Sequence, residues 1–122
     1  MRRRFFLLLL TALMMPVAAL AHHGLMIWDE DEVTTIEGFI SAEMDGFPHW
    51  EINVRTPEGE EWTIDVGSEF EMGKAGMKAE DLTIGTKVKV EGNRPRDSES
   101  LLLRPLRVIT RDKTYEFRGN WN

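Results

Sequence analysis

The stretch HWEINVRTPEGEEWTIDV, residues 49–66, decides the fold class of this chain. Apolar and polar residues alternate on both sides of a Pro57-Glu58-Gly59 turn. Six apolar residues would share one face: Trp50, Ile52, Val54, Trp62, Ile64 and Val66. A period of two is typical of strands that are buried on one face. Two such runs joined by a Pro–Gly turn therefore predict a β-hairpin.

A longer strand is predicted before the hairpin, over Val33 to Met44, where β-branched residues are frequent. Its inward face would hold Ile36, Gly38, Ile40, Ala42 and Met44. Gly38, in the middle of this face, predicts a bulge or a sharp bend of the strand. Asp45-Gly46 is a turn signal that separates this strand from the hairpin.

A short helix and further strands are predicted after the hairpin. Ser68 is expected to cap a helix that runs to Met77, because Glu71 stands three residues later in capping-box spacing. The strands that follow are expected over Lys87 to Gly92, Leu101 to Thr110 and Thr114 to Phe117. Pro105 indicates an edge or bulge position. This order predicts a mainly β fold, a small five- to six-stranded OB-like barrel of the oligonucleotide/oligosaccharide-binding type, with the helix between strands three and four.

The first 21 residues have the three parts of a cleavable signal peptide. Arg2-Arg3-Arg4 is followed by an apolar run to Met15 and by the small-x-small site Ala19-Leu20-Ala21. The apolar run is shorter than the ~20 residues that a membrane-spanning helix needs. We therefore expect cleavage after Ala21 and a periplasmic or secreted bacterial protein, by general secretory or twin-arginine export. The expected parts are signal 1–21, lead 22–32, barrel 33–117 and tail 118–122.

The charge of the mature chain excludes several classes of partner. Residues 1–21 contain three of the 15 basic residues and none of the 21 acidic ones, so cleavage changes the net charge from −6 to −9. Nucleic acid and anionic membrane surfaces require a basic face, and neither is expected as a partner. The chain has no cysteine, which excludes disulfides, thiolate metal sites and thiol catalysis.

The three histidines are the candidate metal ligands: His22, His23 and His49. After cleavage, His22 would be the amino terminus, and its free amine and imidazole would form a chelate suited to copper. His49 alternates with the inward residues of its strand, so it is expected to be exposed. If the lead packs along that face, the three imidazoles converge. Four methionines offer thioethers to Cu(I), although core packing is the favoured interpretation: Met26, Met44, Met72 and Met77.

Carboxylates and aromatic residues suggest two further kinds of site. Glu51, Asp65 and Glu61 lie on the polar face of the hairpin and would suit acid–base chemistry or a hard cation. A stacking platform for a sugar or peptide is a further hypothesis, with four candidate residues: Trp28, Phe47, Trp50 and Trp121. Of these, Phe47 and Trp121 are expected to be exposed. The sequence shows no catalytic triad order, phosphate loop or dinucleotide motif, which argues against an enzyme.

The chain also resembles a family of small exported bacterial proteins of unknown function. Their mature sequences open with His-His-Ser-Phe and carry Asn-Pro-His after the first strand. The matching positions here are His22-His23-Gly24-Leu25 and Phe47-Pro48-His49. Leu82 to Gly92 is similar to the family's Leu-x-x-Gly-Asp-x-Val-x-Val-x-Gly. This chain lacks the family's Asn, which Phe47 replaces. The resemblance implies export and a barrel-like fold, and it supplies no established activity.

Two functions from different classes remain open. The first is a non-enzymatic periplasmic domain that binds copper or another transition metal through the His22 amine and imidazole, with His23 or His49. The alternative is a module that binds a periplasmic protein or small ligand through its barrel face, without a metal. A metal role requires His22 to be the first residue, whereas a binding module tolerates an added one. An enzyme would need an open coordination position and a substrate cleft.

Overall fold

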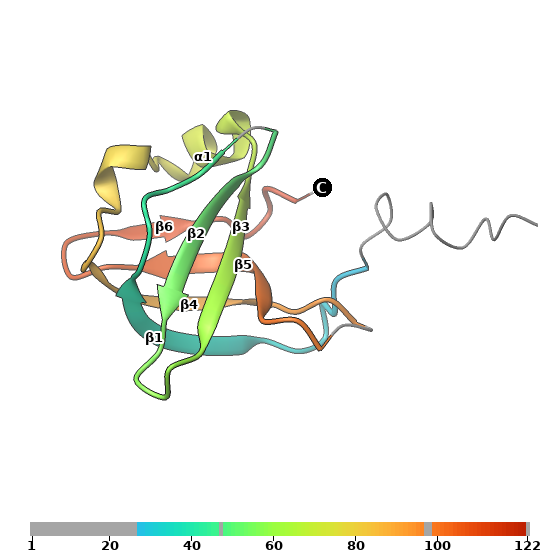
Figure 1. Cartoon of the computed structure of the whole chain (residues 1–122). Coiled ribbons are helices and arrows are strands. Elements are labelled where there is room, and N and C mark those ends of the chain that lie inside the picture. Colours follow the sequence, from blue (N-terminus) through green and yellow to red (C-terminus); the bar gives the residue numbers. More distant parts are fainter. Residues whose placement is uncertain (1–26, 47, 97–98, 122) are drawn as a thin grey trace, which may run out of the picture.

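The computed structural model describes residues 27–46, 48–96 and 99–121. Six strands and two short helices make up this part of the chain (Figure 1). In chain order they are β1 (Thr34–Ile40), β2 (Trp50–Arg55), β3 (Glu61–Gly67), α1 (Glu69–Ala75), the 3₁₀ helix η2 (Ala79–Asp81), β4 (Lys87–Asn93), β5 (Leu102–Ile109) and β6 (Thr114–Glu116). In this part, no helix is long and apolar enough to cross a membrane.

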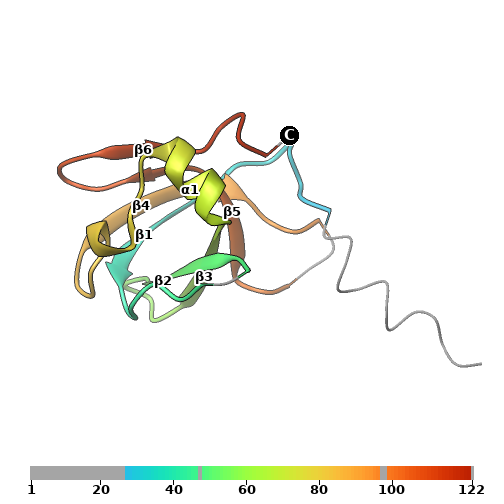
Figure 2. The same ribbon diagram turned by 90° about the horizontal axis from the view of Figure 1, so that it is seen from above.

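Five of the strands close into a barrel. The strand order is β3-β2-β1-β4-β5-β6, and a parallel pairing of β3 with β5 joins the two ends of the five-stranded part. All other neighbours are antiparallel, and β6 is an additional strand on β5. Helix α1 lies over one end of the barrel, as Figures 1 and 2 both show. This topology confirms the predicted OB-like barrel with a helix between strands three and four.

The hairpin that decided the fold class supplies much of the core. Five of its six predicted inward residues are buried, and the sixth, Trp50, is partly buried and packs against them. Burial of apolar surface on this scale is the main favourable term in folding. The buried apolar residues of the barrel are Ile36, Ile40, Ile52, Val54, Trp62, Ile64, Val66, Met72, Met77, Leu82, Val88, Val90, Leu103, Val108, Tyr115 and Phe117.

The prediction for the first strand was wrong at its C-terminal end. Strand β1 ends at Ile40, four residues before Met44. The Ser41 N–H still donates to the Asn53 carbonyl, but the chain then turns, and the next bridge to β2 is between Asp45 and Glu51. Met44 packs against the core from this loop rather than from a strand. The alternation of apolar residues in the sequence therefore continues past Ile40, where the strand itself ends.

Gly38 is required by a close backbone approach and not by a bulge. The register between β1 and β4 runs through Gly38 without a shift. A Cβ atom at this position would lie 2.1 Å from the Arg55 carbonyl oxygen. The irregular positions are elsewhere, between Trp50 and Glu51 and between Glu91 and Gly92. Pro105 pairs with Gly92 beside the second of these, which confirms the bulge position expected for that proline.

The capping box predicted at Ser68 is present. The Ser68 N–H donates to Glu71 Oε2 at 2.8 Å, and the Ser68 hydroxyl contacts the same oxygen. The hydroxyl contact is the main cause that lowers the pKa of Glu71 below its ordinary value. Helix α1 ends at Ala75, and its C-cap residue Gly76 has a left-handed φ of 73°, which suits glycine. The helix buries Met72 against the barrel end.

Candidate functional site

His49 lies immediately before β2, whose first residue, Trp50, pairs with Gly67 at the end of β3, just before α1 begins. Its side chain is 62% exposed, as the alternation predicted. The ring contacts one carboxylate: His49 Nδ1 lies 3.3 Å from Asp65 Oδ2, on the neighbouring strand β3. The backbone N–H of Gly67 donates to the other Asp65 oxygen at 2.9 Å, so the carboxylate is itself held in place.

This arrangement sets the chemistry of the imidazole. An ionised carboxylate can only accept a hydrogen bond, so the contact with Asp65 favours the tautomer that carries its proton on Nδ1. In that tautomer, Nε2 keeps a free lone pair and can bind a transition metal. A histidine that is oriented by a carboxylate through its other ring nitrogen is the usual arrangement of metal-ligating histidines. His49 is therefore suited to serve as one ligand.

The described part of the chain does not contain a complete metal site. Across residues 27–46, 48–96 and 99–121, no three His, Asp or Glu side chains lie close enough together to hold a metal ion. His22 and His23 lie outside the described residues, as does Met26. Met72 and Met77 are buried in the core, which confirms the packing interpretation for both. The described residues therefore place one candidate ligand, His49, and do not show what would complete a site.

The contacts of Glu61, one of the three hairpin carboxylates, do not suit it to act as a general acid. Glu61 accepts hydrogen bonds from the Ser41 hydroxyl and from Arg55 Nε, the latter at 2.8 Å. These two contacts lower the pKa of Glu61 below its ordinary value, which keeps the carboxylate ionised. Glu51 is exposed and pairs across the strands with Asp65. A general acid would need a raised pKa, and the contacts of Glu61 act in the opposite direction.

The described end of the lead packs on the β4–β5 loop and not along β2. The Asp29 N–H donates to the Arg94 carbonyl at 2.9 Å, and the Arg96 N–H donates to the Ile27 carbonyl at 2.8 Å. Trp28 forms a β-bridge with Pro95 in the same place. Convergence of the three histidines required the lead to pack along the face that carries His49. Residues 27–29 do not lie on that face.

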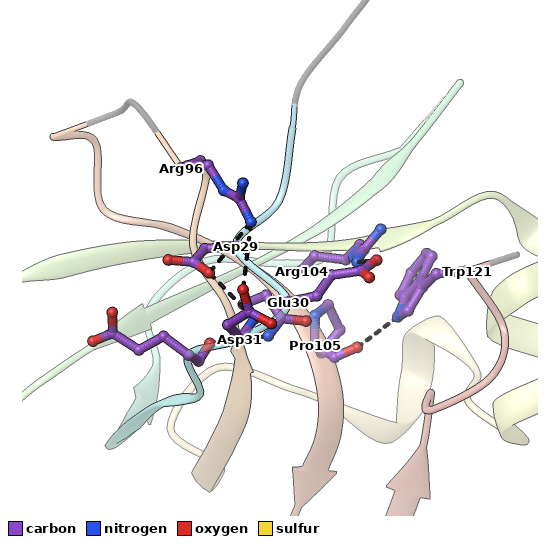
Figure 3. Close-up of polar contacts among 9 residues, drawn as sticks. Asp29, Glu30, Asp31, Arg96, Arg104, Pro105 and Trp121 are labelled. Atoms are coloured by element: carbon purple, nitrogen blue, oxygen red, sulfur yellow. Dashed lines mark hydrogen bonds and ion pairs between the residues drawn. The ribbon is translucent and has the colours of Figure 1, made fainter.

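Acidic residues of the lead form ion pairs with arginines that follow β4 and lie in β5. Figure 3 shows Arg96 between Asp29 and Asp31, with each carboxylate 3.8 Å from Arg96 Nη2. Glu30 accepts from Arg104 Nη2 at 3.1 Å. The side chains of Arg96, Asp31 and Glu30 are at least half exposed, and such pairs contribute little individually, whereas the Arg104 side chain is only 14% exposed. Together with the Trp28 bridge, they fix the direction in which the chain enters β1.

Trp28 and Trp121, two of the four aromatic residues considered for a stacking platform, are engaged by Arg104. The Arg104 guanidinium lies 5.3 Å from the Trp28 ring and 5.6 Å from the Trp121 ring, so the two indoles flank a cation. Trp121 also donates from Nε1 to the Pro105 carbonyl at 2.8 Å and stacks on Phe117 (Figure 3 shows the hydrogen bond). The prediction that Trp121 is exposed was therefore wrong. Phe47, the other residue expected to be exposed, lies outside the described residues.

Sequence reasoning missed the role of Arg104 because its two aromatic partners are far from it in the chain. The available signal was the alternation of β5. Leu103 and Pro105 are buried, so Arg104 between them belongs to the outer face. An arginine on an outer face can lie over aromatic rings as readily as in water. Which rings it meets depends on how the two ends of the chain return to β5.

The family of the chain follows from a comparison with protein-family models. A model described as a family of unknown function, DUF6152, matches residues 11–103. The chain belongs to the DUF6152 family. The match covers β1 to β4 of the DUF6152 barrel, both short helices and the first two residues of β5. No curated protein matches the chain. Membership in DUF6152 supports the predicted resemblance to an uncharacterised family and assigns no reaction, ligand or partner.

Proposed function

We propose that this protein is an exported, non-enzymatic domain that binds a transition metal, most suitably copper, at its mature amino terminus. The His22 amine and imidazole would supply the chelate, and His23 or His49 would complete it. Cleavage after Ala21 and a periplasmic or secreted location are part of the proposal. The preference for copper rests on the set of ligands. The proposed ligands are nitrogens, with no thiolate and few carboxylates, and such a set favours Cu(II).

The observation that carries the proposal is the contact between His49 and Asp65. It gives an exposed imidazole whose Nδ1 contacts a carboxylate, which leaves Nε2 as the nitrogen suited to bind a metal. His22 stands six residues before Trp28, which is anchored on Pro95. An extended chain of that length reaches roughly 20 Å, which limits where the amine can lie. If His49 lies beyond this reach, His23 is the remaining imidazole for the site.

The first test acetylates the α-amine of His22. We expect the chain from His22 to Asn122 to bind one Cu(II) ion in isothermal titration calorimetry. Acetylation removes the amine as a ligand and should weaken binding by about 100-fold or more, since losing a ligand costs more than losing a ligand's hydrogen-bond partner. The same chain amidated at Asn122 is the matched control and should bind as the unmodified chain does. Equal affinity for the free and acetylated amino termini would contradict the chelate and leave a binding module without a metal.

The second test addresses His49 through its carboxylate. If His49 is a ligand, Asp65→Asn should weaken Cu(II) binding by about tenfold, because outer partners of ligating histidines contribute 10–100-fold. Glu51→Gln is the matched control, since Glu51 pairs across from Asp65 and is exposed. Electron paramagnetic resonance should also show one fewer imidazole nitrogen in His49→Ala. Unchanged affinity and spectrum in both variants would remove His49 from the site and leave His22 and His23.

A further inference from the structure

Strand β1 has a segment with a partner on one edge only. It pairs with β4 through six residues, from Thr34 to Phe39. Its pairing with β2 is limited to two residues, Phe39 and Ile40, because β2 ends at Arg55 and the chain then turns. The part of β1 that precedes Gly38 therefore extends past the end of β2, as Figure 1 shows for the long, curved β1 ribbon. Within the described residues, no other strand pairs with this edge.

The direction of the backbone groups follows from two hydrogen bonds. The Ile40 N–H donates to the Thr86 carbonyl, which places the N–H groups of alternate residues 36 and 38 toward β4. The Ser41 N–H donates to the Asn53 carbonyl of β2, so the intervening residues face the opposite edge. Thr35 and Glu37 consequently present their N–H and C=O groups where β2 would continue. Both residues are exposed.

An acidic groove lies along this open edge. Its volume is ≈ 520 Å³, and it lies between β1 and the β2–β3 turn. Its lining contains three carboxylates and no basic side chain: Thr35, Ile36, Glu37, Thr56, Pro57, Glu58 and Glu60. Val33 and Phe39 flank the edge, and each is 51% exposed. The groove thus combines free strand hydrogen-bonding groups, negative charge and two apolar side chains.

We propose that an extended, basic segment of a partner protein binds here as an added strand on β1, at Thr35 and Glu37. Main-chain hydrogen bonds to an open sheet edge are a general mode of peptide recognition. Glu37, Glu58 and Glu60 would attract lysine or arginine side chains of the segment. A second copy of this chain is disfavoured, because it would bring the same three carboxylates to the same groove. This surface is independent of the proposed metal site.

The backbone part of the proposal is tested with a Lys-Val-Lys-Val-Lys-Val peptide and amide hydrogen exchange measured by NMR. The peptide should slow exchange at Thr35 and Glu37, whereas its Glu-Val counterpart should not. Thr35→Pro removes one edge donor without touching the β4 ladder, and it should abolish the protection at Glu37 while the melting curve stays cooperative. Slow exchange at both amides in the protein alone would mean that the chain covers its own edge, and would overturn the proposal.

The charge part is tested by removing two carboxylates. Glu58→Gln/Glu60→Gln should weaken binding of the basic peptide by about tenfold and reduce its dependence on salt. The matched control is Glu80→Gln/Glu99→Gln, which removes two exposed carboxylates away from the groove. Equal weakening by both double variants would show only a general attraction to the negative chain. Tight pairing of the protein with itself, detected by analytical ultracentrifugation, would assign the edge to a second copy and also overturn the proposal.

Discussion

Replacing Gly38 with alanine is expected to lower the free energy of unfolding by about 3 kcal/mol. The new Cβ would lie 2.1 Å from the Arg55 carbonyl oxygen and 2.8 Å from the carbonyl carbon. Carbon–oxygen contacts are ordinarily about 3.3 Å or longer, so β1 and β2 would have to separate. Both obstructing atoms belong to the backbone, which cannot rotate away as a side chain can. Urea denaturation measures the loss, and the melting temperature should fall by more than about 12 °C.

The matched control is the same substitution in open space. A Cβ atom at Gly73 of α1 meets nothing within 4 Å, and alanine is the better helix former. Gly73→Ala should therefore stabilise the protein by roughly 0.5–1 kcal/mol. A Gly38→Ala protein as stable as the wild type would show that β1 and β2 separate without cost where they cross. The close approach would then not be the reason for glycine at this position.

Replacing Phe117 with alanine is the second substitution with a large expected effect, a loss of about 3–5 kcal/mol. Phe117 is 0% exposed and belongs to the core, although it stands just beyond β6, the strand that lies outside the closed barrel. Its ring stacks on Trp121 with centroids 5.8 Å apart. The substitution would leave a cavity and remove one of the surfaces that hold Trp121, and with it the contact to Arg104.

The control for Phe117 is another phenylalanine that contributes little burial. Phe70 in α1 is 71% exposed, and its ring contacts the Lys74 ammonium at 5.3 Å. Phe70→Ala should change the free energy of unfolding by less than about 1 kcal/mol. Comparable losses for the two variants would argue against a specific role of the C-terminal segment. A loss confined to Phe117→Ala, with reduced tryptophan fluorescence change on unfolding, would confirm that role.

The positions of the candidate ligands could be predicted in part. Exposure of His49 followed from its alternation with Ile52 and Val54, and it is confirmed. The contact with Asp65 could not be predicted, because it depends on the register between β2 and β3 and on the bulge beside Trp50. The chelate at His22 and the site of cleavage stay predictions, since those residues lie outside the described part.

By itself, the sequence determined the local elements and their order. The hairpin over residues 49–66, the capping box at Ser68 and the bulge at Pro105 all follow from periodicity and from short-range backbone chemistry, which act within a few residues. These signals also predicted the barrel, because few topologies accept that order of elements. The family model matches residues 11–103, which include the hairpin and the capping box.

Only the tertiary structure decided where β1 ends, which backbone groups remain open and what the aromatic residues contact. Strand β1 stops at Ile40 because the chain turns away from β2 after Ser41, although the alternation of its sequence continues. Trp121 is packed because Arg104 and Phe117 lie beneath it. The open edge at Thr35 and Glu37 exists because β2 turns away at Arg55. Each of these results depends on a partner distant in sequence, which periodicity does not encode.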